Sequence, residues 1–172
     1  MARELIHAAG PLAAPSANLS GKPSPTSLSD ALEDFEGKVG AWLDGGRCAI
    51  GIESTVVSLL GETPVLLRPG SITREQIEEA LGQKVALPLS GGPVVSPGMK
   101  YRHYAPKAKV RLVYDERDLR GGTVLRFLRA ETLYAELRRC DRASVSEIDV
   151  LCSQETRSDS ALMDRLLRAA ER

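Results

Sequence analysis

One segment constrains the fold more than any other: Ser96-Pro-Gly-Met-Lys-Tyr-Arg-His-Tyr-Ala-Pro106 cannot form a regular helix or strand. Its prolines remove backbone donors and restrict the residues before them, and its glycine permits positive φ. The segment therefore predicts an extended connector between two units of the 172-residue chain. Its positive charge beside tyrosine rings suits phosphates and a stacked base, although a solvated basic linker would have the same composition.

The composition of the chain narrows the class of protein. Hydrophobic residues make up 42% of the chain and aromatic residues only 4%, which predicts a globular core of Leu, Val, Ile and Ala. The formal net charge is zero, so an anion site has to come from local arrangement. The three cysteines form no CxxC pair, the two histidines lie far apart, and no apolar run has membrane-spanning length. We therefore expect a cytoplasmic protein with free thiols, no metal held by the protein and no membrane contact.

Residues 1–90 are predicted to form a first α/β unit. Helices are indicated at residues 1–9, 27–37 and 73–82, and the last two open with capping signals at Ser27 and Thr73. Short apolar runs indicate strands at residues 11–15, 39–43, 48–60, 65–67 and 84–87.

Two features of this unit are candidate ligand sites. The loop from Ser16 to Pro25 places hydroxyls and the Asn18 amide after a predicted strand, where ligands of α/β sheets bind. Such groups could hold a phosphate or an amino-acid carboxylate, but the same residue types also make ordinary turns. Arg68 precedes a rigid Pro-Gly pair, so it is either a fixed guanidinium for phosphate or a surface arginine beside a turn.

The residues after the connector predict a small open α/β unit. Apolar patterns indicate strands at residues 109–114, 122–127 and 148–151, and helices at 131–139 and 158–170. The last helix has Leu162, Met163, Leu166, Leu167 and Ala170 on one predicted face. The acidic residues at 115, 116 and 118 lie among arginines, which favours a solvated turn over a pair of catalytic carboxylates.

Four motifs occur in the order found in the Sua5/YrdC family: Pro15-Ser-Ala-Asn-Leu-Ser-Gly21, Glu53-Ser-Thr-Val56, Leu67-Arg-Pro-Gly70 and the segment from Ser96 to Pro106. The last motif resembles the interdomain linker of the two-domain Sua5 type. The resemblance implies an α/β fold in three parts. Residues 1–90 would be the C-terminal half of a YrdC-like twisted-sheet catalytic domain, residues 91–108 a proline-rich basic linker, and residues 109–172 a shortened, Rossmann-like Sua5 C-terminal domain.

The resemblance also implies an activity. The family makes L-threonylcarbamoyladenylate from ATP, L-threonine and bicarbonate and releases pyrophosphate, for the t6A37 modification of tRNA. This chemistry needs positioning and charge neutralisation more than a dedicated nucleophile, and Mg²⁺ would come bound to the phosphates. Further implied partners are tRNA or RNA and other proteins of t6A synthesis.

The family's ligand residues can be placed on this sequence motif by motif. Matching positions imply L-threonine contacts at Ala14 and Ser54. They imply ATP contacts in the serine and asparagine loop, in the arginine motif and in the linker, at Ser16, Asn18, Ser24, Arg68, Tyr101, His103 and Tyr104.

One departure from the family is large. Members carry about half of the catalytic domain ahead of the Ser16 loop, including a lysine and arginine motif that grips ATP, and no counterpart is found here. The resemblance therefore implies an N-terminally truncated fragment, which we expect to be marginally stable alone because small units bury less of their surface. The alternative is a catalytically silent nucleotide- or RNA-binding remnant. A related carbamoyltransferase is a third reading, against which the linker argues.

Overall fold

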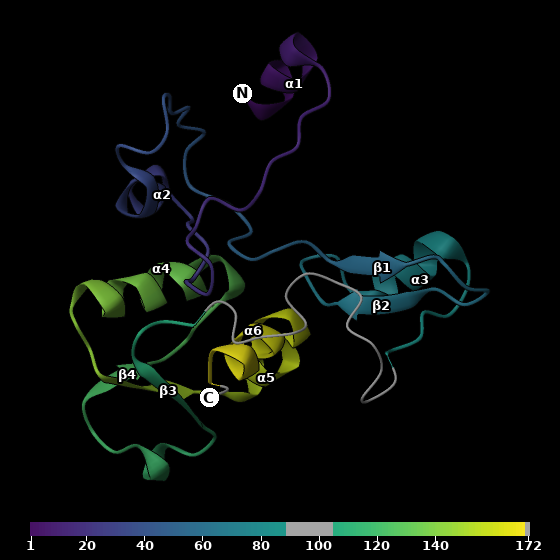
Figure 1. Ribbon diagram of the computed structural model, residues 1–172. Helices are drawn as coiled ribbons and strands as arrows, with labels where there is room; N and C mark the ends of the chain where they lie inside the picture. Colours follow the sequence, from purple (N-terminus) through teal and green to yellow (C-terminus); the bar gives the residue numbers. More distant parts are fainter. Residues whose placement is uncertain (89–104, 171–172) are drawn as a thin grey trace.

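The computed structural model describes residues 1–88 and 105–170 (Figure 1). The connector prediction, with Tyr101, His103 and Tyr104, lies outside the described residues except for Ala105 and Pro106. The described residues contain no helix that is both long enough and apolar enough to cross a membrane.

The C-terminal unit is a three-stranded parallel sheet in the order β3-β5-β4, which confirms the small α/β unit. β3 (Lys109–Val113) and β4 (Thr123–Leu125) both pair with the central β5 (Glu147–Leu151). The connections contain the short 3-10 helix η1 (Glu116–Asp118) and the helix α4 (Ala130–Arg142). After β5 the chain forms α5 (Gln154–Ser158) and α6 (Ser160–Ala170).

One face of this sheet and two helices form the core. Ile148 and Val150 of β5 are fully buried, as are Leu133 and Leu137 of α4, and Leu166 of α6 joins the same cluster. Successive side chains of a strand point to opposite faces of the sheet, so Asp149, between Ile148 and Val150 on β5, points away from this core. There the Arg111 guanidinium donates to both oxygens of Asp149 at 2.8 and 2.6 Å. The prediction that Leu167 lies on the packed face of the last helix is wrong, since its side chain is half exposed.

The described part of the N-terminal unit has less regular structure than its sequence predicts. It contains the helices α1 (Ala2–Ala9), α2 (Leu28–Phe35) and α3 (Arg74–Leu81). A two-stranded antiparallel sheet pairs β1 (Val56–Ser58) with β2 (Val65–Arg68). The Thr73 capping box of α3 is present, and Gly82 ends that helix in the left-handed region with φ +66°.

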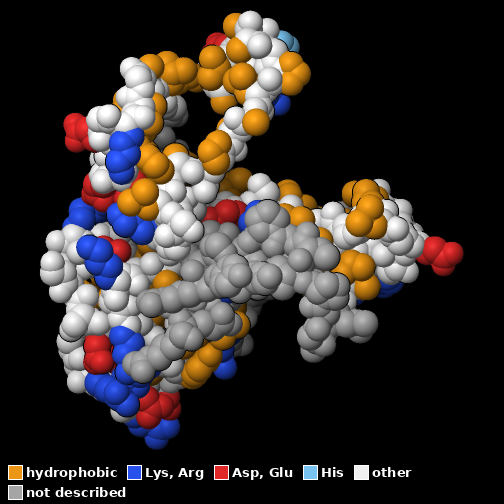
Figure 2. All heavy atoms as spheres, viewed as in Figure 1, with side chains coloured by type: hydrophobic (Ala, Val, Ile, Leu, Met, Phe, Trp, Pro, Cys, Tyr) orange, Lys and Arg blue, Asp and Glu red, His pale blue; other side chains and the backbone are white. Residues whose placement is uncertain are grey.

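Several strand predictions in this unit are wrong. The ranges 11–15 and 39–43 contain no strand, only Val56–Ser58 of the range 48–60 is extended in a sheet, and 84–87 contributes a single bridge between Ala86 and Val65. A strand needs a hydrogen-bonded neighbour, and the described residues offer no partner strand for the ranges 11–15 and 39–43. Large apolar side chains in the ranges 11–15 and 39–43 are exposed instead, namely Leu12, Val39 and Leu43. Figure 2 shows hydrophobic atoms at the surface over α1 and the chain beside it.

Ion pairs tie the N-terminal unit to α4. The Arg138 guanidinium donates to Asp34 Oδ2 at 2.7 Å and to the Pro23 carbonyl at 3.0 Å, and both charged side chains are buried. Lys22 donates to the other oxygen of Asp34 at 2.7 Å. Burial alone would raise the pKa of the Asp34 carboxyl, but the hydrogen bonds from Arg138 and Lys22 outweigh it and hold the pKa below its usual range. The loop that ends at Lys22 is thereby fixed against the C-terminal unit.

Candidate functional site

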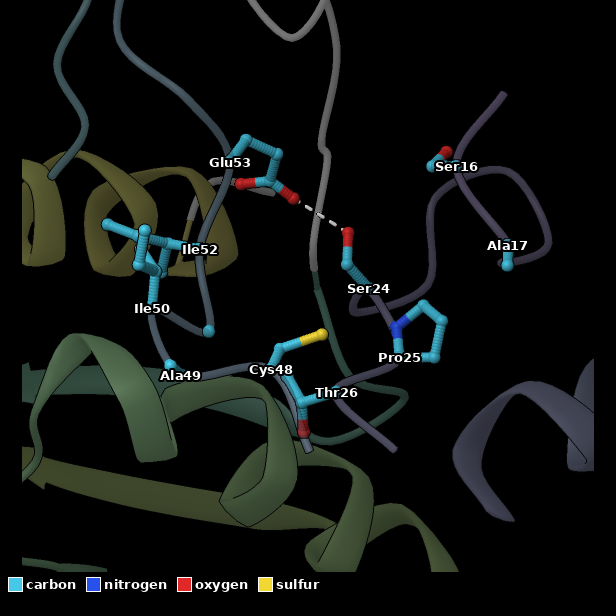
Figure 3. A pocket seen from close by; sticks show the side chains of 11 residues that line it. Ser16, Ala17, Ser24, Pro25, Thr26, Cys48, Ala49, Ile50, Ile52 and Glu53 are labelled. Atoms are coloured by element: carbon cyan, nitrogen blue, oxygen red, sulfur yellow. Dashed lines mark hydrogen bonds between the residues drawn. The ribbon is translucent and has the colours of Figure 1, made fainter. Parts of the chain in front are cut away.

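A cavity of about 470 Å³ lies between the loop of residues 16–26 and the segment of residues 48–53 (Figure 3). Its volume is in the range of small-molecule sites. Its walls are mostly small or apolar, and they consist of Ser16, Ala17, Ser24, Pro25, Thr26, Cys48, Ala49, Ile50, Gly51, Ile52 and Glu53.

The loop on one side of the cavity is shaped by its own hydrogen bonds. Asn18 Nδ2 donates to the carbonyls of Leu19 and Lys22 at 3.0 and 3.2 Å, and the Lys22 amide donates to the Leu19 carbonyl at 3.1 Å. Gly21 turns the chain with φ +86°, which favours glycine. The Asn18 side chain thus holds the turn, and it is not among the residues that line the cavity.

Glu53 is the polar centre on the other side. Its Oε1 accepts a hydrogen bond from Ser24 Oγ at 2.6 Å, and its Oε2 accepts from Tyr134 OH at 2.8 Å and from Arg165 Nε at 2.9 Å. Burial would raise the pKa of this carboxyl, but the hydrogen bonds from Ser24, Arg165 and Tyr134 outweigh it and keep the pKa below its usual range. The carboxylate is therefore charged at neutral pH.

Arg165 of α6 connects Glu53 to the end of β2. Its side chain is fully buried, and besides Glu53 it donates to the Pro69 carbonyl at 3.1 Å and to Asp164. Pro69 follows Arg68 directly, and the Arg68 guanidinium donates to the Ser54 carbonyl from Nε at 3.1 Å and from Nη2 at 3.0 Å. The predicted ligand residues Ser54 and Arg68 are thus adjacent in space. Arg165 bonds the residue next to each of them in the chain, Glu53 before Ser54 and Pro69 after Arg68.

Two glycines allow the close approach of backbones beside the cavity. Gly51 has φ +75°, and a Cβ there would lie 2.5 Å from the backbone of Glu131 at the start of α4. At Gly70 a Cβ would lie 2.3 Å from the amide nitrogen of Thr55. Both contacts are shorter than a carbon side chain allows, so only glycine fits.

The structure brings some of the predicted ligand residues together and not others. Ser16 and Ser24 line the cavity, whereas Ala14 is exposed and, like Ser54, is not among the lining residues. The Arg68 guanidinium donates to the backbone carbonyl of Ser54. Tyr101, His103 and Tyr104 lie outside the described residues.

Sequence reasoning missed the residues that organise this site. Arg165 lies in the helix predicted at residues 158–170, and Tyr134 in the helix predicted at 131–139. Both helices were predicted from their leucines, so neither residue was singled out. One signal was available: Arg165 is three residues after Leu162 and four before Ala169, which places a charge on the apolar face of the helix. A charge on such a face needs a buried partner, and Glu53 is that partner.

Comparison with known proteins gives consistent matches. The Sua5, YciO and YrdC family, described as Telomere recombination, matches residues 1–70. The family described as Threonylcarbamoyl-AMP synthase, C-terminal domain, matches residues 72–125.

Among curated proteins, the Threonylcarbamoyl-AMP synthase of Pyrococcus abyssi is 53% identical over 112 residues, which are 63% of this chain and 33% of the relative. The protein of the same name from Schizosaccharomyces pombe is 40% identical over 161 residues, which are 87% of this chain and 37% of the relative. The chain thus spans about a third of the length of these relatives.

Two solved structures share the fold. The crystal structure of P. abyssi Sua5 complexed with L-threonine superposes with a TM-score of 0.76 at 36% identity, covering 91% of this chain and 56% of the other. A P. abyssi Sua5 variant with a histidine and the next residue, a tyrosine, both changed to alanine superposes with a TM-score of 0.84 at 35% identity, covering 98% and 60%.

Proposed function

Because the chain belongs to the Sua5/YrdC family, we propose that it carries part of the site that forms L-threonylcarbamoyladenylate from ATP, L-threonine and bicarbonate. Curated relatives are named Threonylcarbamoyl-AMP synthase, and a similar solved structure contains L-threonine. The product would serve the t6A37 modification of tRNA, and tRNA or partner proteins of that modification remain predicted partners. Cytoplasmic localisation likewise remains a prediction.

The contact between Arg68 and Ser54 is the observation that carries the proposal. Arg68 is the predicted ATP cation and Ser54 the predicted threonine hydroxyl, and the Arg68 guanidinium lies 3.0 to 3.1 Å from the Ser54 carbonyl. ATP and threonine have to meet for the reaction, so residues for each are required side by side. Ser16 and Ser24 line a cavity next to this pair, since Glu53 belongs to the cavity wall and precedes Ser54.

The proposed reaction is a displacement at the α-phosphate. The threonine amino nitrogen first bonds to the carbon of bicarbonate, and the C–OH bond of bicarbonate breaks, so that water leaves with a proton from the amine and a carbamate remains. A carbamate oxygen then bonds to the α-phosphorus, and the bond from that phosphorus to the oxygen bridging to the β-phosphate breaks. Pyrophosphate leaves with that electron pair. Arg68 would neutralise charge that develops on the phosphates, and MgATP would be the substrate form. Ala14 and Ser54 would position threonine, while Asn18 would keep the serine loop in shape.

The linker residues Tyr101, His103 and Tyr104 are proposed to cover the nucleotide. This chain has one adjacent histidine and tyrosine pair, His103-Tyr104. A P. abyssi Sua5 variant was made with an adjacent histidine and tyrosine changed to alanine, which supports choosing His103-Tyr104 for substitution in this chain.

The test is pyrophosphate release by the 172-residue chain from ATP in the presence of threonine and bicarbonate. We expect release that disappears when either co-substrate is left out. Arg68→Ala should abolish it, whereas Arg74→Ala, which removes an α3 arginine paired with Glu78, should not. ATP binding without any threonine-dependent release would instead support the silent remnant.

A further inference from the structure

The loop of residues 16–26, the serine loop, takes two of its backbone contacts from α2, the helix that follows it in the chain. Asp34 accepts a hydrogen bond from the Leu19 amide at 3.3 Å, and Asp30 accepts one from the Thr26 amide at 3.2 Å. Both acids are buried, and they lie one turn apart on the helix. Like charges at this spacing repel each other, and buried charges need partners of opposite sign. The hold of α2 on the loop therefore depends on cations that neutralise this pair.

The helix α4 of the C-terminal unit, which lies next to α2 in Figure 1, supplies most of that positive charge. Arg138 Nη2 donates at 2.7 Å to Asp34 Oδ2, the same oxygen that accepts from the loop amide. Arg142 Nη1 donates to Asp30 Oδ1 at 3.1 Å. Among the described residues, the third cation paired with these acids is Lys22 of the loop itself. The carboxylates that hold the loop are thus held in turn by α4.

Arg138 also contacts the serine loop directly. Its Nε donates to the Pro23 carbonyl at 3.0 Å, and its Nη1 donates to the Asp30 carbonyl at 3.2 Å. The Pro23 carbonyl and the Ser24 nitrogen belong to one peptide group, so the first of these hydrogen bonds lies beside Ser24. The Arg138 side chain is only 4% exposed, and its planar fork has fixed donor directions that a lysine ammonium does not reproduce. One buried guanidinium therefore connects the C-terminal unit, α2 and the loop.

We propose that Arg138 is a positioning residue that sets the conformation of the serine loop, so that the C-terminal unit controls the placement of Ser24 through α4. The inference rests on the proposed function in taking Ser24 as part of an ATP site. It adds how the C-terminal unit acts on that site. Coupling between two sites is reciprocal, so a nucleotide bound at the loop should in turn stabilise the contact between α4 and the loop.

The first experiment needs no ligand. Backbone amides of the ¹⁵N-labelled 172-residue chain are recorded by NMR, and their hydrogen exchange is measured in the parent chain and in Arg138→Met. The Leu19 amide should exchange about tenfold faster in the variant, because its acceptor Asp34 loses the buried partner that orients it. The Ser24 amide resonance should also shift, because the carbonyl of its own peptide group loses a donor. A loss of overall stability alone would accelerate exchange in β5 and leave the Ser24 resonance in place.

Two further variants define the role. Arg138→Lys keeps the positive charge, so it tests the same point if Arg138→Met does not fold, and it should still shift the Ser24 resonance because it lacks the guanidinium fork. Arg139→Met is the matched control, since it removes the neighbouring arginine of α4, whose side chain is exposed and paired with Glu136. This control should leave both the Ser24 resonance and the exchange of the Leu19 amide as they are in the parent chain.

The second experiment adds MgATP. In equilibrium dialysis, Arg138→Met should bind MgATP about tenfold more weakly than the parent chain, which is within the usual range of coupling between two sites. Arg139→Met should bind MgATP like the parent chain. In the parent chain, saturating MgATP should slow the exchange of the Leu19 amide, which is the reciprocal effect.

Several results would overturn the inference: an unchanged Ser24 resonance in Arg138→Met, a parent-like Ser24 resonance in Arg138→Lys, equal effects of Arg138→Met and Arg139→Met, or unchanged MgATP affinity in a variant whose loop is released. A chain whose loop responds to Arg138→Met but which binds no MgATP would leave the role of Arg138 in the loop standing and sink the proposed function. The two can therefore fail separately.

Discussion

Replacing Arg165 tests whether the C-terminal unit holds the candidate site in place. In Arg165→Met the side chain keeps most of its length but loses its charge and every donor. Its hydrogen bonds to the Glu53 carboxylate at 2.9 Å and to the Pro69 carbonyl at 3.1 Å disappear inside a fully buried environment.

The size of the effect follows from what remains paired. Removing one partner of a buried ion pair costs about 3–5 kcal/mol when the other charge is left alone. Glu53 keeps its donors Ser24 and Tyr134, and Asp164 keeps Arg168 at 2.9 Å. The lower end therefore applies, and we expect the free energy of unfolding to fall by about 3 kcal/mol.

Urea unfolding followed by circular dichroism measures this change. With a slope of about 2 kcal/mol per molar urea, the midpoint should fall by about 1.5 M. The matched control is Arg117→Met, which removes an exposed arginine paired with Asp115, and its midpoint should equal that of the parent chain. An Arg165→Met midpoint as high as the control's would refute the reasoning that Arg165 ties the two units together.

Three further predictions concern local structure and pH. Gly51→Ala should destabilise the chain by several kcal/mol in urea unfolding, because its Cβ would lie 2.5 Å from the α4 backbone, while Gly46→Ala, with φ +85° and open space, should cost only about 1 kcal/mol; equal losses would exclude a close contact at Gly51. Thr73→Ala should cost about 1 kcal/mol by removing the α3 capping box, and an unchanged melting curve would show that α3 does not depend on its cap. The folded-state pKa of Glu53 is lowered, so its contribution to stability is present above the unfolded pKa and is lost as pH falls through the folded pKa. Arg165→Met removes one of the hydrogen bonds that lower this pKa, so in urea unfolding the variant should lose less stability on acidification than the parent chain. A steeper loss would contradict the assignment of Arg165 as a partner of the Glu53 carboxylate.

The C-terminal unit could be predicted from the sequence because its elements complete one another. The alternating residues of β5 and the 3.6-residue pattern of α4 both face one core, so local pattern and packing agree. In the N-terminal unit the apolar runs at 11–15 and 39–43 have strand composition but lack a partner strand among the described residues. Composition indicates that a segment is suited to a sheet, whereas pairing decides whether a strand forms.

The candidate site was predictable only in part for the same reason. Ser16 and Ser24 were found because their loop combines turn residues with hydroxyls, and both line one cavity. The contacts of Arg165 and Tyr134 with Glu53 join residues 112 and 81 positions apart, and local sequence patterns carry no information on such pairs. The linker residues Tyr101, His103 and Tyr104 remain predictions.

The most direct measurement of the central claim is a titration of the ¹⁵N-labelled chain with MgATP, followed by L-threonine, in which backbone amide resonances are recorded by NMR. The account predicts that MgATP shifts the amides of Ser16, Ser24 and Arg68, that threonine then shifts Ser54, and that Arg165→Met weakens both responses together. Saturable binding that shifts other parts of the chain and leaves these four amides unchanged would contradict it.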